Sequence, residues 1–176
     1  MANPCFACLY APPAPDRPAA TSGTLLAIAR EFSPRYERRG DDLMVIDVGG
    51  LERLLGPPAV IAEELRREAA ARSVRVHIAL AATCSAASVL AYARPGVTVV
   101  EPGQEKQRLA PLPIHVLRHI SPERESLRSS GTFSTLGAIE HWGIRTLGEL
   151  AALPSGQLAA RLGAAGLLWQ ALARGE

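Results

Sequence analysis

The order of apolar segments along residues 5–100 restricts the fold of this chain more than any other feature. Short runs with strand character alternate with longer runs in which apolar residues recur at helical spacing. This strand–helix–strand–strand–helix–strand order, with one more helix and strand, is that of a ferredoxin-like sheet. We therefore expect an α+β fold whose mostly antiparallel sheet carries helices on one face, within a compact domain spanning residues 1–102. Expected strands lie at 5–10, 35–39, 43–48, 74–81 and 97–100, and expected helices at 21–32, 57–72 and 83–93.

Prolines separate the expected elements at two places. Residues 11–23 hold four prolines in thirteen residues, which excludes a regular helix or a central strand, so we expect a linker there. Residues 103–131 contain the proline-punctuated run Leu109 to Pro113 and then a polar stretch, which indicates a connector. Residues 132–176 are expected to be all-helical, with helices near 132–141, 146–152, 155–162 and 164–174.

Composition excludes several classes of protein. A hydrophobic share of 48% and a charged share of 20% are typical of a globular protein rather than a disordered one. No apolar run approaches the roughly 20 residues of a membrane span. The N-terminus also lacks the pattern of a secretory signal, so we expect a cytoplasmic protein without a membrane partner. The net charge of +2 is too small to steer the chain strongly towards nucleic acid.

The cysteines and histidines predict no metal site. Cys5 and Cys8 are spaced as C-x-x-C, but no second pair completes a zinc set, and they lie in an expected buried strand. His115 and His119 are four residues apart and lack a third ligand. Asp47 is expected to brace the Gly49-Gly50 turn. We therefore expect no cofactor.

The run from Leu136 to Leu150 predicts two short helices joined by a tight turn. Its glycine permits a positive φ, and the spacing of Thr146 and Glu149 is that of a capping box. Such a turn directs backbone N–H groups to one spot beside the positive end of a helix, where a phosphate can bind. The run resembles a helix-hairpin-helix motif, a sequence-independent binder of the DNA backbone, and a looser copy lies at 158–173. The candidate DNA-binding residues are Gly143, Ile144, Arg145, Thr146, Gly163 and Gly166.

A ferredoxin-like domain followed by helix-hairpin-helix units is also the order of palm and thumb in the Y-family translesion DNA polymerases. Residues 40–50, GDDLMVIDVGG, resemble that family's segment S-I-D-E-A-F-L-D-V-T-G. Residues 79–88 resemble G-I-A-x-N-K-x-L-A-K, and residues 142–150 resemble its run into the thumb. Residues 46–56 are also similar to L-D-x-x-G-x-x-x-L-F-G of ImuB-type mutasome proteins, which are polymerase-like subunits without a working metal site.

The departures from the family pattern concern the residues of catalysis. Polymerisation uses two Mg²⁺ ions held by acidic side chains. The family's first strand, I-D-M-D, matches a run here without a carboxylate, with Leu9 at an expected acidic position. The second segment keeps Asp42 but has Leu43 in place of the glutamate, and Cys84 replaces the lysine that meets the triphosphate. The resemblance therefore implies no catalytic residue, a vestigial Asp42 and no bound metal.

The resemblance also implies a domain organisation and partners. Residues 11–23 are too short for the family's fingers, and the chain ends before a little finger, so we expect both to be missing. The ImuB-type likeness implies a non-catalytic accessory in DNA repair and damage-induced mutagenesis, with the sliding clamp, a RecA-like protein and an error-prone replicative-type polymerase as partners. One alternative is an active Mg²⁺-dependent nucleotidyltransferase with a reorganised site around Asp41, Asp42 and Asp47. Another is a degenerate remnant or a protein-interaction module without a role on DNA.

Overall fold

The computed structural model describes residues 4–13, 21–120 and 135–176. The chain divides into two compact units, Met1–Gly103 and Gln104–Glu176, which are considered one at a time. None of the described helices is both long enough and apolar enough to cross a membrane.

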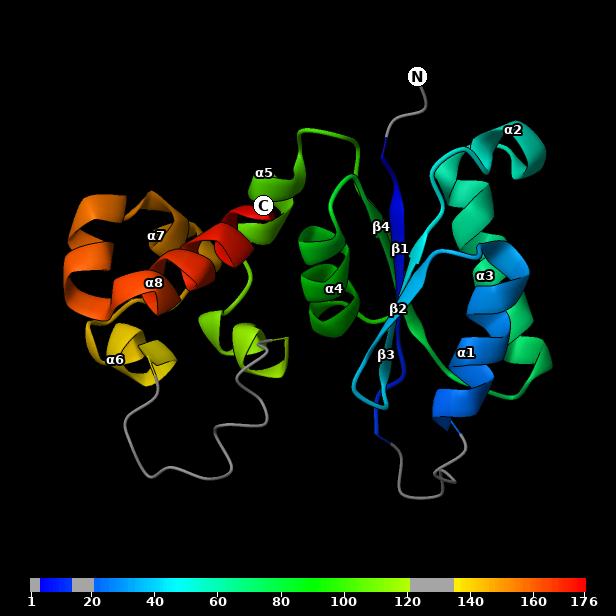
Figure 1. Cartoon of the computed structure of the whole chain (residues 1–176), viewed down its shortest axis with the longest axis horizontal. Coiled ribbons are helices and arrows are strands. Elements are labelled where there is room, and N and C mark those ends of the chain that lie inside the picture. Colours follow the sequence, from blue (N-terminus) through cyan, green and yellow to red (C-terminus); the bar gives the residue numbers. More distant parts are fainter. Residues whose placement is uncertain (1–3, 14–20, 121–134) are drawn as a thin grey trace. The chain divides into compact units, whose positions relative to one another are not determined.

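The first unit is built on a five-stranded sheet with the strand order β2-β3-β1-β4-β5 (Figure 1). Strand β1 pairs antiparallel with β3 and β4, β2 pairs antiparallel with β3, and β5 pairs parallel with β4. The order β2-β3-β1-β4 is that of a split βαβ fold, which confirms the expected α+β class. The strands are β1 (Phe6–Tyr10), β2 (Tyr36–Arg39), β3 (Leu43–Asp47), β4 (His77–Ala81) and β5 (Val97–Val99).

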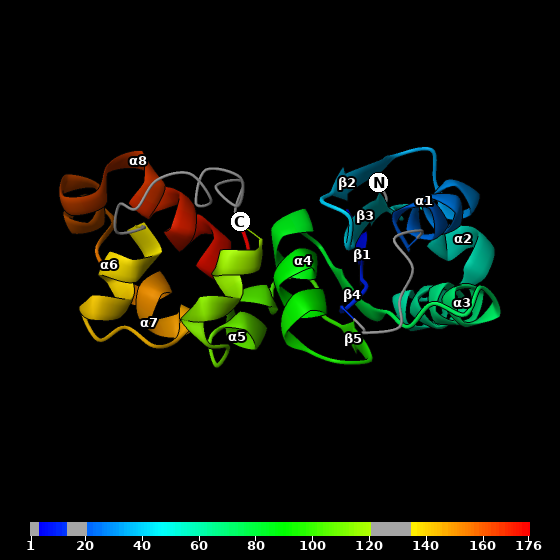
Figure 2. The same ribbon diagram turned by 90° about the horizontal axis from the view of Figure 1, so that it is seen from below.

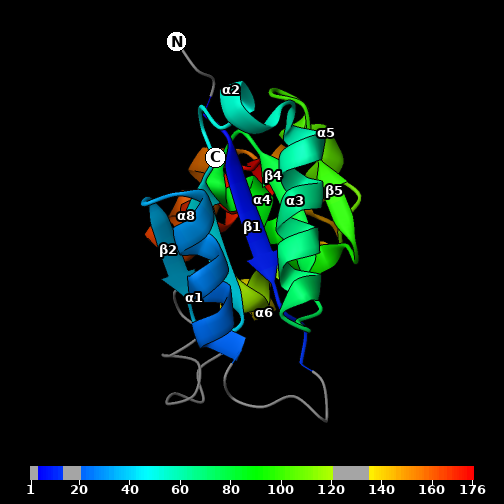
Figure 3. The same cartoon turned by 90° about the vertical axis from the view of Figure 1, so that its right-hand side faces the viewer.

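Helices α1 (Thr21–Phe32) and α3 (Pro58–Ala71) cover one face of this sheet. Figure 3 shows them side by side with β1 visible between them. Their apolar residues share one core with alternate residues of the three central strands. The largest side chains of this core are Leu9, Leu25, Ile28, Met44, Ile46, Ile61, Leu65, Ile78 and Leu80.

Helix α4 (Cys84–Ala93) packs on the opposite face of the sheet, so the prediction of helices on one face only is wrong (Figure 1). The aromatic contact between Tyr10 and Tyr92, with ring centroids 4.6 Å apart, lies on this second face. Small side chains such as Ala86 and Ala87 are fully buried and let α4 approach closely. The continuous apolar runs of β1 and β3 are the sequence signal for a sheet covered on both faces.

Local interactions fix the ends of these elements. The side chain of Thr83 caps α4 by accepting a hydrogen bond from the N–H of Ala86 at 3.2 Å. The predicted role of Asp47 is confirmed, because its carboxylate accepts a hydrogen bond from the N–H of Gly49 at 3.0 Å. The same carboxylate pairs with Arg35 at 3.0 Å. The short helix α2 (Glu52–Leu55) follows this turn and was not predicted.

The second unit is helical (Figure 2). Part of the expected connector folds within it as α5 (Glu105–Leu109) and the 3-10 helix η1 (Ile114–His119). These segments contribute Leu109 and Leu117 to a buried core that also holds Ile139 and Trp169. The remaining helices are α6 (Thr135–His141), α7 (Leu147–Ala152) and α8 (Ser155–Arg174).

Helix α8 joins the two helices expected at 155–162 and 164–174. Gly163 interrupts it with φ 61° and ψ −151°, a non-helical conformation. The expected break is therefore present as a bend inside one element.

Candidate functional site

The register between β1 and β3 decides which residues can meet beside Asp42. Tyr10 lies directly opposite Leu43, and the N–H of Ala11 donates to the carbonyl of Asp42 at 2.8 Å. Residues directly opposite each other project from the same face of a sheet. Leu9 instead pairs with Met44 and is buried in the core beneath α1 and α3. Leu9 and Leu43, which the resemblance places at two acidic positions, therefore project from opposite faces of the sheet.

The β1 positions that share a face with Leu43 are those of Phe6, Cys8 and Tyr10, and none of these side chains is a carboxylate. Burial raises the pKa of the Cys8 thiol to about 12, so this thiol stays protonated at neutral pH. Among the residues described by the structure, no three His, Cys, Asp or Glu side chains gather as a possible metal site.

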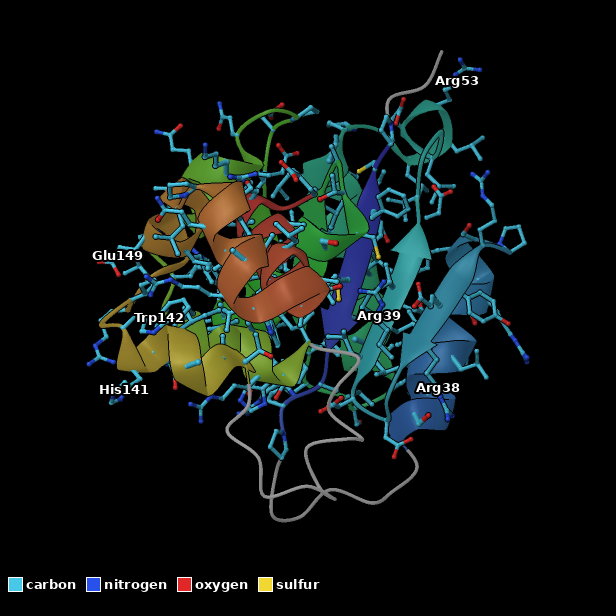
Figure 4. The ribbon with its side chains drawn as sticks, turned by 60° about the vertical axis from the view of Figure 1, so that its left-hand side comes forward. Arg38, Arg39, Arg53, His141, Trp142 and Glu149 are labelled. Carbon is cyan, nitrogen blue, oxygen red and sulfur yellow. The ribbon has the colours of Figure 1, made fainter. Side chains whose placement is uncertain are left out.

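Arg39 is a cation on this sheet face that sequence reasoning missed (Figure 4). Its guanidinium donates to the Cys84 sulfur at 3.0 Å and to the Ser88 hydroxyl at 3.4 Å. It also forms two hydrogen bonds with the Glu37 carboxylate, at 2.9 and 3.2 Å. Cys84, where the resemblance predicts a lysine, is thus contacted by a cation from β2. The sequence signal is Glu37 and Arg39 two apart on one strand, which places them on one face.

The turn between α6 and α7 contains four of the six predicted DNA-binding residues. Gly143 adopts φ 84°, as its position in the turn requires. The predicted capping box is present, because the Thr146 hydroxyl accepts from the N–H of Glu149 and the Glu149 carboxylate accepts from the N–H of Thr146, both at 3.2 Å. The N–H of Arg145 also donates to that carboxylate, at 2.6 Å. These backbone hydrogen bonds, that of Arg145 first, lower the pKa of Glu149 below its ordinary value of 4.5.

The expectation of unpaired N–H groups at the start of α7 is wrong. The N–H of Leu147 donates to the carbonyl of Leu112, and that of Gly148 donates to the carbonyl of Ala110, both at 2.9 Å. Glu149 supplies the acceptor for the two preceding N–H groups. A carboxylate of the chain itself thus occupies the place at which a phosphate was expected. Whether the turn binds DNA remains a prediction, but it cannot rest on these amides.

The two glycines of the looser second copy have different roles. A Cβ added at Gly163 would meet nothing within 4 Å, so this glycine is required by its backbone conformation. Gly166 is buried, and a Cβ there would lie 2.8 Å from the Cβ of Leu162. Gly166 therefore serves close packing and is not placed to touch a ligand. The N–H groups after Gly163 begin a new helical segment, whose first donors have no partner within that segment.

An aromatic and cationic surface, missed from the sequence, joins the two turns. Trp142 is 40% exposed, and the guanidinium carbon of Arg161 lies 5.4 Å from the centroid of its ring. This contact places Arg161, which lies two residues before Gly163, against Trp142, which directly precedes Gly143. The guanidinium of Arg145 donates to the carbonyl of Glu140 at 3.2 Å. Figure 4 shows His141, Trp142 and Glu149 on the helical unit.

Comparisons with known proteins place this geometry in a family. Residues 2–92, just over half of the chain, match the impB/mucB/samB family. The chain is 31% identical over 154 residues to the protein ImuB of Caulobacter vibrioides, covering 86% of this chain and 31% of that protein. It is 35% identical over 146 residues to the DNA polymerase IV of Dehalococcoides mccartyi, covering 81% of this chain and 35% of that protein. The chain thus spans about a third of the length of these relatives.

A solved structure supports the same assignment at the level of the fold. The DinB family error-prone DNA polymerase from Sulfolobus solfataricus matches with a TM-score of 0.63 at 17% identity, over 88% of this chain and 45% of that one. The match includes the palm-like sheet and extends into the helical unit. From the family match and these relatives, we conclude that the chain belongs to the impB/mucB/samB family and is a relative of the Y-family DNA polymerases.

Proposed function

We propose that this chain is a non-catalytic, polymerase-like protein that binds the DNA backbone as an accessory in DNA repair and translesion synthesis. The observation that carries this proposal is the cross-strand pair of Tyr10 and Leu43 beside Asp42. An acidic site at the ends of β1 and β3 needs carboxylates at positions that share this face. Beside Asp42, the side chains at those positions are a phenol, a buried thiol and a leucine. Asp47 shares this face but lies opposite Phe6 at the other end of the strands and pairs with Arg35.

The physical argument concerns divalent cations. Mg²⁺ binds through oxygen ligands, and a two-metal site needs several carboxylates in one place. Asp42 provides one. The Arg39 guanidinium, which contacts Cys84 on this face, is protonated at every physiological pH and adds a positive charge where a metal ion would need carboxylates. Mg²⁺ belongs only to the alternative of an active enzyme.

Active nucleotidyl transfer remains the second candidate, because DNA polymerase IV proteins are among the relatives. Primer extension on a primed template, with Mg²⁺ or Mn²⁺, separates the two. We expect no incorporation above a no-protein control. Template-dependent incorporation that Asp42→Ala abolishes would establish the active alternative and overturn the proposal.

The helical unit is proposed to act as a helix-hairpin-helix thumb. Since the amides of α7 already have acceptors, we assign the phosphate contacts to the Arg145 side chain and to the segment that begins after Gly163. These donors read phosphate rather than bases, so DNA of different sequences should bind alike. With few phosphates contacted, the affinity should be on the order of 10⁻⁴ to 10⁻⁶ M and fall with added salt.

The protein partners implied by the ImuB likeness are also proposals. Co-purification with the full chain tests each of them directly, namely the sliding clamp, a RecA-like protein and an error-prone replicative-type polymerase. The third alternative, a remnant or an interaction module without a DNA role, predicts that the chain binds none of single-stranded, duplex or primed DNA at low salt.

A further inference from the structure

The two tryptophans of the chain have different environments. Trp169 is 2% exposed and lies in the core of the helical unit. Trp142 is 40% exposed at the end of α6, where Gly143 turns the chain away with φ 84°. A large aromatic side chain left this exposed at a turn is available to a planar ligand.

One face of the Trp142 ring is already covered. The guanidinium of Arg161 lies over it, with 5.4 Å between the guanidinium carbon and the ring centroid. A cation in this position is attracted by the ring and limits the orientations that the ring can adopt. The part of the Trp142 ring that stays exposed can stack against a second flat group. Because Arg161 already restricts the ring, a ligand would lose less free energy in ordering it.

The charges around this ring favour an anionic ligand. Arg161 has no carboxylate partner among the described residues, and Arg145 donates only to a backbone carbonyl there. Of the two carboxylates beside this turn, Glu140 pairs with Arg118, whereas Glu149 accepts from two backbone N–H groups, keeps its negative charge and attracts Arg145. The surface therefore combines an accessible indole with Arg161, which has no ion pair among the described residues, and with Arg145, whose charge is partly offset by Glu149.

We propose that Trp142 is a stacking platform for an unpaired base of single-stranded DNA, with Arg161 beneath the ring and close to the neighbouring phosphates. Stacking of a base on an aromatic side chain tolerates any base, because every base has a π-face, and arginine adds a cation–π contribution. This inference rests on the proposed DNA-binding function and extends it. The unit then prefers DNA with an unpaired base over a closed duplex.

The experiment uses the full chain and three labelled probes of about 12 nucleotides, within the range of small single-strand sites. The probes are oligothymidine, the same backbone with abasic residues, and a duplex. Binding is followed by fluorescence anisotropy of the label and by quenching of tryptophan emission. We expect oligothymidine to quench the emission of Trp142 and to bind more tightly than the abasic strand.

Two substitutions test the ring itself. Trp142→Ala should weaken oligothymidine binding about 5- to 150-fold, the range for loss of one stacked base, and leave the abasic and duplex probes unchanged. Trp142→Phe, which keeps an aromatic ring, should retain most of the affinity. Arg161→Met should weaken all three probes, because it also removes a charge, whereas Arg161→Lys should restore binding of the abasic strand. Leu54→Ala, at a leucine that is 81% exposed in the other unit, is the matched control and should change nothing.

Several outcomes overturn the inference. Equal losses on all three probes with Trp142→Ala, while circular dichroism and Trp169 emission stay native, would make the ring a structural support. Unchanged oligothymidine binding would refute stacking, and Trp142→Leu provides the same test if the alanine variant does not fold. Displacement of oligothymidine by an equally tight acidic peptide would assign the surface to a protein partner. If the parent protein binds none of the probes, the proposed DNA function fails as well.

Discussion

Substitution of Gly163 by alanine tests the bend in α8 on which the second DNA-binding turn depends. The backbone at Gly163 has φ 61° and ψ −151°, a region that is essentially restricted to glycine. No heavy atom lies within 4 Å of a Cβ built there, so the cost is conformational and not steric. Holding a non-glycine residue in such a region costs about 1–3 kcal/mol. We expect Gly163→Ala to destabilise the helical unit by this amount.

Two other glycines of α8 provide matched controls. Gly156 is exposed, has no positive φ, and leaves open space for a Cβ, so Gly156→Ala should be neutral or stabilise by up to about 1 kcal/mol. Gly166→Ala places a Cβ 2.8 Å from that of Leu162 and 3.1 Å from the Cγ of Leu158. Overpacking costs about 1–3 kcal/mol, offset by about 1 kcal/mol of helix propensity. The three variants separate backbone strain from crowding.

Urea unfolding followed by Trp169 emission measures these differences, with Trp142→Phe as the common background. Trp169 is buried in the same unit and reports on it directly. At a slope of roughly 1 kcal/mol/M, the midpoint of Gly163→Ala should fall by about 1 M or more, with the slope unchanged. If Gly163→Ala unfolds at the same urea concentration as Gly156→Ala, residue 163 is helical in solution, and a phosphate site built on a break in α8 is refuted.

Three further predictions concern single side chains. Arg145→Glu should weaken binding to every DNA sequence and reduce the slope of log K against log salt by about 0.9, one phosphate contact, as measured by anisotropy titrations; an unchanged slope would remove Arg145 from the interface. Because folding lowers the pKa of Glu149 below its ordinary value of 4.5, the ionised side chain stabilises the folded state at pH values above 4.5, and this contribution is lost as the pH falls through the lower folded pKa. The melting temperature of Glu149→Gln should therefore depend less on pH across that acidic range than the melting temperature of the parent; identical pH profiles for parent and variant would contradict this. Cys8, fully buried and with a pKa raised to about 12, should resist alkylation at neutral pH until urea unfolds the chain, as followed by mass spectrometry; fast labelling of Cys8 in the folded protein would show that the sheet face is open.

The sequence predicted the strands well where both faces of the sheet bury them. The apolar runs of β1 and β3 have few alternative placements, and their observed bounds differ from the expected ones by one residue. The position of α4 on the second face of the sheet was not predicted, because this helix is rich in alanine and its faces differ little in hydrophobicity. Helix α5 was missed because the prolines that follow it at 111 and 113 suggested an extended connector.

The candidate sites show where local sequence reasoning stops. The capping box of Thr146 and Glu149 was predictable, because all its atoms lie within four residues. The loss of free donors at α7 was not, since the accepting carbonyls of Ala110 and Leu112 lie 38 and 35 residues before their donors, Gly148 and Leu147. The contact of Arg39 with Cys84 likewise spans 45 residues. Such pairings come from topology, and a motif by itself does not contain them.

The bridge between Pro113 and Thr146 sets the smallest piece of the helical unit that can be expressed and studied alone. A fragment starting at residue 132 would leave the N–H groups of Leu147 and Gly148 without their carbonyl acceptors and would uncover the core on the side of Leu109 and Leu117. Each lost acceptor costs on the order of 1–3 kcal/mol when the donor stays buried. A fragment starting at Gln104 keeps both. Domain exchanges with longer relatives should therefore join the chains between residues 103 and 104. The segment expected to be a connector then stays in one chain with the helices that it packs against.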